Sequence, residues 1–493
     1  MSTQTAPAGL HLAPPPLRRN WRFQLLWIGA TSTTLGVEAV DVAYPLLVLG
    51  LTGSPALAGL FGFVQAATNV LLGLPIGQLV DRWNHRTMLI GAEALRALAT
   101  ASVAIAITTG HLTMIHLMLV AAVLGIGAAF GGPVRMLLVR AVVPPEQLTQ
   151  ALTQDEVREG AAGLIGPAVG GTLYGIARVL PFLACAATFT LSLLCTLFVR
   201  IPPRTPTSQH TTDTHPNNQN HQSTQHTQGT QGTQGTQGTQ GIQGNRSGPA
   251  DPAAHTTTPA PGPDTTPDTG TNAGTDTAPG TGASTGTGAA PGTEGMFAGV
   301  LELWRNPLLR GAILLIGTFY LIITAIILTV VVTLRTQHTS PALIGTALSG
   351  SAVGMLLGAP FVSKLHTLMT PGRLLITVSA VVAAAVALLA APLGPWWVFA
   401  TLILATLTVP ALRVLIDIMI LRQVTEDRRG RTIVAVMTVL SVGPPLGTMT
   451  AGLLLQYTTP LTTTITLAAI QATVTLYGLT NHHISQAHWP EQP

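Results

Sequence analysis

A series of long apolar segments, separated by short polar ones, constrains this chain more than any other feature. A bilayer core of about 30 Å is crossed by about 20 residues of α-helix. About twelve segments reach that length, at residues 22–50, 55–80, 87–109, 113–139, 150–177, 179–199, 309–333, 341–364, 372–391, 395–421, 432–456 and 460–480. Only 9% of the residues are charged, against about 25% in soluble domains. The sequence therefore predicts an all-α membrane protein.

A stretch of different composition separates the two groups of six segments. Residues 201–296 are rich in Thr, Gln, Gly and Pro and contain the repeat TQGTQGTQGTQG. Such a sequence lacks the apolar side chains that would offset the entropy of ordering it. We expect a disordered linker between two six-helix bundles, at 21–200 and 297–481, with tails at 1–20 and 482–493. Low complexity explains its histidines better than metal binding does, and we expect no metal and no cofactor; these histidines are His210, His215, His221 and His226.

The distribution of Arg and Lys predicts the orientation of the helices. Cytoplasmic loops of membrane proteins carry an excess of these residues. With an even number of helices, one side receives most of the basic residues near helix ends and the other side receives Arg178 and Arg335. Both termini and the linker are therefore expected in the cytoplasm, with the protein in the plasma membrane. The net charge of +4 follows from this topology, and no base-stacking aromatic cluster indicates nucleic-acid binding.

The two halves share local sequence features. Gly166-Pro167 in the first half corresponds to Gly443-Pro444 in the second, and in both cases a polar loop and a preceding Pro and Arg lie upstream. This correspondence suggests a duplicated six-helix unit. Parallel repeats of this kind place a substrate site near the bilayer midplane and alternate its access between the two sides.

The polar turn between the second and third segments carries a family resemblance. Its sequence GQLVDRWNHR, residues 77–86, resembles the signature Gly-x-Leu-x-Asp-Arg-x-Gly-Arg-Lys of the major facilitator superfamily of secondary transporters. Asn84 replaces the second glycine, and Asn tolerates the left-handed backbone that a turn can need. The resemblance implies a latch that holds the cytoplasmic side shut in one state; the alternative is a turn with positive-inside anchors. The latch residues are Gly77, Asp81, Arg82 and Arg86.

Further motifs resemble particular branches of this family. The segment PLLVLGLTGSPALAGL, residues 45–60, looks most like macrolide-efflux proteins and siderophore exporters. GPAVGG, with Gly166, Pro167, Gly170 and Gly171, is similar to the end of a fifth-helix motif associated with antiporters. GIGAAF, residues 125–130, resembles the fourth-helix motif of proton-linked drug exporters, but Ala121 stands where that motif has Arg. If protons drive transport, the coupling site therefore differs from that of the usual drug exporter.

Two acidic residues lie inside the first apolar segment. A carboxylate near a helix centre costs about 2.5 to 3.5 kcal/mol on insertion scales, so Glu38 and Asp41 need a reason to be there. Their i, i+3 spacing places them on one face, where two carboxylates raise each other's proton affinity. We expect this pair to couple transport to protons or to attract a cationic substrate; a structural hydrogen-bond network is the alternative. Tyr44, Gln65 and Asn69 are further cavity candidates.

Other charged residues fall near the predicted cytoplasmic helix ends. The spacings of Glu93 with Arg96 (i, i+3) and of Arg413 with Asp417 (i, i+4) suit ion pairs, and we interpret these charged residues as gate or packing residues. They are Glu93, Arg96, Arg135, Asp155, Arg158, Arg413 and Asp417.

The resemblance implies a monomeric secondary transporter that exports a drug or secondary metabolite in exchange for protons. Motifs of membrane proteases, serine hydrolases and nucleotide-driven pumps are absent from the sequence, so we do not expect an enzyme. The expected partners are the lipid bilayer, a small-molecule substrate and protons. An uptake permease, a siderophore exporter and a non-transporting receptor or scaffold are the alternatives.

Overall fold

Helix boundaries follow the apolar segments closely. The computed structural model describes residues 17–199, 307–391, 393–423 and 438–482, without the side chains of residues 74–82, 145, 307–309 and 417–423. The predictions for the two tails, the linker and the side chains of Gly77, Asp81, Arg82 and Asp417 therefore lie outside the described part of the chain.

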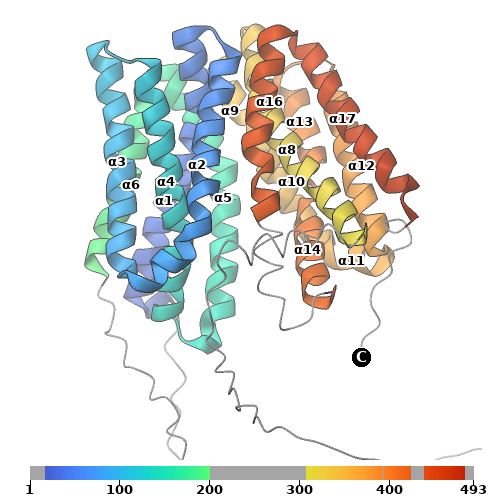
Figure 1. Cartoon of the computed structure of the whole chain (residues 1–493). Helices are drawn as coiled ribbons and strands as arrows, with labels where there is room; N and C mark the ends of the chain where they lie inside the picture. The colour runs from blue at the N-terminus through green and yellow to red at the C-terminus, as the bar shows by residue number, and fades with distance from the viewer. Residues whose placement is uncertain (1–16, 200–306, 392, 424–437, 483–493) are drawn as a thin grey trace, which may run out of the picture. The chain divides into compact units, whose positions relative to one another are not determined.

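Six long helices form the first half (Figure 1). They are α1 (Trp21–Thr52), α2 (Pro55–Arg82), α3 (His85–Thr109), α4 (Met114–Val142), α5 (Leu148–Ile176) and α6 (Leu180–Phe198). Gly53 and Gly110 end α1 and α3 in the left-handed conformation, with φ of 67° and 74°, which glycine adopts without a Cβ clash. Asn84 caps α3 through its side chain with φ of −69°, so this position uses the capping ability of Asn and no left-handed backbone.

Helices occupy the predicted positions of the second half as well. They are α8 (Pro307–Thr336), α9 (Pro341–Leu348), α10 (Gly350–Gly358), α11 (Val362–Leu368), α12 (Pro371–Leu389), α13 (Pro395–Thr406), α14 (Val409–Gln423), α16 (Gly443–Tyr457) and α17 (Pro460–Thr480).

The segments predicted at 341–364 and 395–421 each form one candidate membrane span, at Pro341–Leu368 and Pro395–Ile416, but each span contains short interruptions that the sequence analysis did not predict. The first is divided into α9, α10 and α11 and the second into α13 and α14. Gly354 meets the backbone of Ile403, and Thr406 donates a hydrogen bond of 2.7 Å to the carbonyl of Ser351. Pro360 and Pro410 also lack the N–H that a continuous helix needs. Close packing of α10 on α13 thus interrupts both segments.

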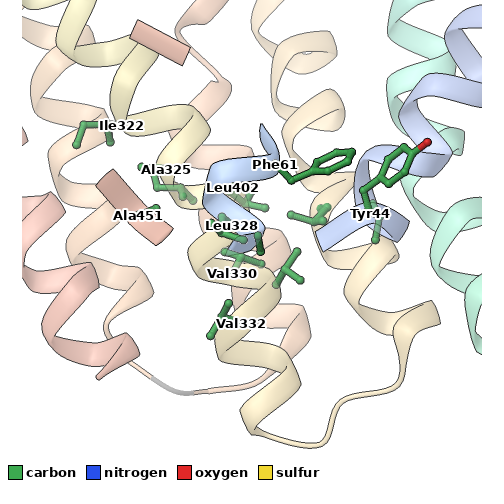
Figure 2. Packing of buried hydrophobic residues seen from close by; sticks show 14 of the residues in the cluster. Tyr44, Phe61, Ile322, Ala325, Leu328, Val330, Val332, Leu402 and Ala451 are labelled. Carbon is green, nitrogen blue, oxygen red and sulfur yellow. The ribbon is translucent and has the colours of Figure 1, made fainter. Parts of the chain in front are cut away.

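The described helices belong to one compact unit. In the first half α1 packs against α5 and α6, and in the second half α16 packs against α8. Apolar side chains from both halves form one core, part of which Figure 2 shows around Tyr44, Phe61, Leu328 and Ala451. Ten described segments are long and apolar enough to cross a membrane. The chain is therefore an all-helical membrane protein with two six-helix bundles.

Two names are used below for the ends of the helices. The proximal end is where α1 begins and α6 ends, and the distal end is where α1 ends and α2 begins. Since consecutive long helices alternate in direction, α16 ends and α9 begins at the distal end.

Candidate transport site

The two carboxylates of α1 occupy the middle of a helix that Pro45 interrupts. Because proline has no backbone N–H, the carbonyl of Asp41 loses its usual helical donor. Glu38 is half-buried, while Asp41 is exposed although its neighbours Val40 and Val42 are buried. Asp41 interacts electrostatically with Glu38 and Arg96. Two acids and one base therefore interact far from either end of α1, and Asp41 is the exposed member of this group.

The glycines of GPAVGG pack on α1 beside Glu38. A Cβ at Gly166 would collide with the Cβ of Glu38, and one at Gly170 with the backbone of Ala39. On a neighbouring face of α5, the carbonyl of Pro167 meets Gly345 of α9. The motif therefore lies between the helix that carries the acids and a helix of the second bundle.

The second bundle repeats this crossing. Gly443 meets the Cβ of Tyr320, and Gly447 meets the carbonyl of Leu321 on α8. By these contacts Tyr320 occupies in the second bundle the position of Glu38 in the first. The internal correspondence seen in the sequence is thus present in the packing, and the acidic pair belongs to one half alone.

Tyr44 does not line an opening in this structure. Its side chain is 1% exposed and stacks on Phe61 at 4.6 Å (Figure 2) and edge-on to Phe182 at 5.0 Å between ring centroids. Gln65 is half-buried and Asn69 is exposed, and the backbone of both packs on Gly125 of α4. Polarity in a spanning helix predicted a cavity position for Tyr44, but its ring contributes to the apolar core instead.

The predicted gate residue Glu93 is a fixed part of the first bundle. It is 0% exposed, accepts a bond of 2.6 Å from Arg135 Nη2 and accepts another of 3.3 Å from Thr33 Oγ1. These contacts join α1, α3 and α4 inside one bundle. Arg158 makes a similar strut from α5 to α1, with donated bonds to Asp155 Oδ1 at 2.8 Å and the carbonyl of Ala30 at 3.0 Å.

We expect Glu93→Ala to lower the free energy of unfolding by about 3–5 kcal/mol, because the guanidinium of Arg135, whose side chain is 15% exposed, loses its carboxylate partner. Thermal unfolding in detergent measures this loss of stability, and monodisperse elution from a sizing column shows that the variant is folded before heating. Glu146→Gln is the control, since Glu146 is exposed on a turn. Unchanged thermal stability of Glu93→Ala, with altered access from the two sides, would instead support the gate interpretation.

Arg86 joins α3 to α6. Its Nε donates to the carbonyl of Thr196 at 3.3 Å, and its Nη2 donates to the carbonyl of Leu197. Both carbonyls lie at the C-terminal end of α6, where a positive charge is favourable. Arg86 thus holds two helix ends of one bundle together at the proximal end.

Arg413 reaches the other bundle at the proximal end. Its Nη1 lies 3.6 Å from Glu156 Oε2 of α5, and both side chains are more than half exposed. The pair borders a cavity of about 510 Å³ that Tyr320, Leu440 and Pro444 also line. This contact crosses between the bundles, and the predicted partner Asp417 has its side chain outside the described part of the chain.

Contacts at the distal end join the bundles more tightly. A Cβ at Gly59 of α2 would lie 2.7 Å from the Cα of Gly452 of α16. Ser54 donates a bond of 2.7 Å to Gln456 Oε1, and Arg335 of α8 donates one of 3.1 Å to the carbonyl of Leu46. In Figure 1, α2 and α16 lie side by side.

Sequence reasoning did not select these distal residues. Small residues at helix contacts are a usable signal in membrane proteins, and Gly59 and Gly452 carry it. Arg335 entered only as one of the basic residues that set the topology. The isolated charge at a helix end was the feature that could have marked it.

The family comparison covers most of the chain. The family model described as Major Facilitator Superfamily matches residues 26–336 and 312–483. Macrolide efflux protein A of Streptococcus pyogenes is 28% identical over 162 residues, which are 32% of this chain and 39% of that protein. The putative multidrug resistance protein MdtD of Escherichia coli O6:K15:H31 is 30% identical over 159 residues, 32% of each chain. The matches thus span less than half the length of these relatives.

Solved structures share the fold over nearly the whole length. A bacterial homologue of the human lysosomal transporter Spinster, in an inward-facing and unoccupied conformation, has a TM-score of 0.61 at 15% identity and covers 97% of this chain and 100% of its own. A bacterial homologue of the iron transporter ferroportin, in an inward-facing state, has a TM-score of 0.61 at 12% identity, with coverages of 94% and 100%. With its two helical bundles and the family match along both, this chain belongs to the Major Facilitator Superfamily of membrane transporters.

Proposed function

We propose that this transporter exports small, amphipathic cations from the cytoplasm across the plasma membrane in exchange for protons. The names of the partial relatives, macrolide efflux protein A and multidrug resistance protein MdtD, support export of drug-like molecules. The observation that carries the proposal is the acidic pair in the middle of α1, where Asp41 is exposed and the half-buried Glu38 packs against Gly166 of α5.

The acidic pair supplies both requirements of cation and proton exchange. Two neighbouring carboxylates do not easily stay ionised together away from water, so one holds a proton while the site is empty. An incoming cation favours the ionised form and displaces that proton. Binding of the two ligands at one site is then mutually exclusive, and exchange follows if only a loaded site crosses between the two states.

The packing of the bundles supports a loading state. Glycine contacts close the distal end, whereas the proximal end has the cavity of about 510 Å³ and an exposed ion pair. With the cytoplasmic orientation proposed from the distribution of Arg and Lys, this arrangement is open toward the cytoplasm. A substrate would enter there and leave after the distal contacts separate.

Everted membrane vesicles that contain the full chain test the proposal with ethidium as the probe. We expect an acid-inside pH gradient to drive ethidium into the vesicles, and nigericin, which collapses that gradient, to stop it. Vesicles without the protein provide the background. Accumulation that ignores the pH gradient would reject proton exchange, and resistance profiling of a drug-sensitive host would then identify substrates directly.

The proximal ion pair predicts a shift between states. Glu156→Arg places two positive charges opposite each other, so we expect the proximal side to stay open longer and transport to slow. Adding Arg413→Glu restores the attraction with the charges exchanged, and we expect transport to recover. Labelling of a single cysteine near Ser441, in a chain without Cys185 and Cys195, reports the proximal opening. Equal labelling in all three variants would show that this pair has no gating role.

A further inference from the structure

Arg96 is a buried base without a close acidic partner. It is 9% exposed, and its Nε has no hydrogen-bond acceptor. Among the described side chains, no carboxylate lies within 4 Å of its guanidinium. Glu93, one turn earlier on α3, is engaged by Arg135 at 2.6 Å. Burial of a charge without an acidic partner destabilises the protein, so we expect a functional role for Arg96.

Glycines of α4 hold the side chain of Arg96 in place. A Cβ at Gly127 would lie 2.5 Å from Cγ, 2.7 Å from Cδ and 2.8 Å from Nε of Arg96, and a Cβ at Gly131 would lie 3.6 Å from Nη1. The guanidinium carbon sits 5.1 Å from the ring centre of Phe189 on α6, which is a cation–π distance. The side chain of Arg96 thus occupies a groove on α4 that exists because Gly127 and Gly131 have no side chains.

Among the charged groups around Arg96, one acid remains whose ionisation the arginine could favour. The titratable and charged groups that interact with it are Asp41 of α1, Glu93 of its own helix, Arg135 of α4 and Cys185 of α6. Glu93 is already paired, and Cys185 is a buried thiol. Asp41 is the remaining acid; it is exposed, and it also interacts with Glu38 of its own helix.

We propose that Arg96 is the positioning residue for proton release at Asp41. When Asp41 gives its proton to the water that reaches it, the new carboxylate is stabilised by the fixed charge of Arg96 held on Gly127. This inference rests on the proposed proton exchange. It also accounts for Ala121, which is 0% exposed and leaves no room for an arginine on α4, because α3 supplies the positive charge instead.

Four variants of the full chain test the inference by the pH profile of ethidium exchange. Arg96→Gln removes the charge, Arg96→Lys retains a charge, and Gly127→Ala displaces the arginine without removing it. Gly132→Ala is the matched control on the same helix, since nothing lies within 4 Å of a Cβ there. We expect Arg96→Gln and Gly127→Ala to move the midpoint of the profile upward by about one pH unit or more, Arg96→Lys to shift it less, and Gly132→Ala to leave it in place.

The action through Asp41 has its own control. In the Asp41→Asn background, Arg96→Gln should cause no further shift, because the group that it stabilises is gone. If Arg96→Gln does not fold, the comparison of Gly127→Ala with Gly132→Ala shows whether the position of Arg96 sets the pH profile. Profiles of Gly127→Ala and the wild type that coincide would overturn the role of Arg96. A wild-type protein without any response to the pH gradient would instead overturn the proposed function.

Discussion

The double variant Glu38→Gln, Asp41→Asn is expected to lose gradient-driven accumulation of ethidium completely. One pH unit stores about 1.4 kcal/mol per proton, so exchange of one proton for one monovalent cation sustains a concentration ratio of about tenfold. Without a group that binds the proton, that ratio falls to one. The two single variants separate the contributions of the half-buried Glu38 and the exposed Asp41.

Glu146→Gln is the matched control for this measurement, because it neutralises an exposed acid outside the long helices. Exchange of labelled for unlabelled ethidium without a pH gradient shows whether the double variant has lost proton coupling alone or substrate binding as well. Full gradient-driven accumulation in the double variant would eliminate the α1 acids as the coupling site and direct attention to Glu159 on α5, which interacts with Glu38.

The second large effect is expected from a large side chain introduced at Gly171, in the distal contact of α5 and α9. A side chain at Gly171 would collide with the backbone of Pro341, and its Cβ would lie 3.1 Å from the Cα of Gly345. Overpacking of a tight contact costs about 1–3 kcal/mol, which shifts a two-state equilibrium by about 5- to 150-fold. We therefore expect Gly171→Leu to hold the distal end open and to stop transport.

Cysteine labelling on intact cells measures how far Gly171→Leu opens the distal end. Ser54→Cys, in a chain that lacks Cys185 and Cys195, reports the distal end to a membrane-impermeant maleimide. Gly160→Leu on the same helix is the control, since nothing lies within 4 Å of a Cβ at that position. If both leucine variants label and transport like the parent, the glycine contact at Gly171 does not govern closure.

The sequence predicted the helices better than their interruptions. Apolar length decides whether a segment spans a bilayer, and the sequence displays that length directly. The interruption near Ser351 depends on Thr406, a residue 55 positions away. Pro360 and Pro410 are local signals of interruption, whereas contact between two helices leaves little local trace in either of them.

For the site as well, the sequence revealed features of a single helix better than contacts between helices. Glu38 and Asp41 stood out because acids are energetically costly in a spanning helix, and the structure places Glu38 against Gly166 of GPAVGG. The spacing of Glu93 and Arg96 suggested a pair, but Glu93 bonds to Arg135 on another helix. Periodicity along one helix reveals shared faces, whereas the choice of partner depends on which helices become neighbours.

The different chemistry of the two bundle contacts has a consequence for sensitivity to ions. Exposed charges such as Arg413 and Glu156 weaken each other's attraction as ionic strength rises, with a screening length of about 8 Å at physiological salt. The glycine contacts of the distal end depend on shape and dispersion, which dissolved salt does not screen. In the proposed orientation, potassium chloride on the cytoplasmic side would change the balance between states. The same salt outside the cell would change it less, because Arg335 is the one charged group among the distal contacts described above, so the transporter would respond to salt mainly from the cytoplasmic side.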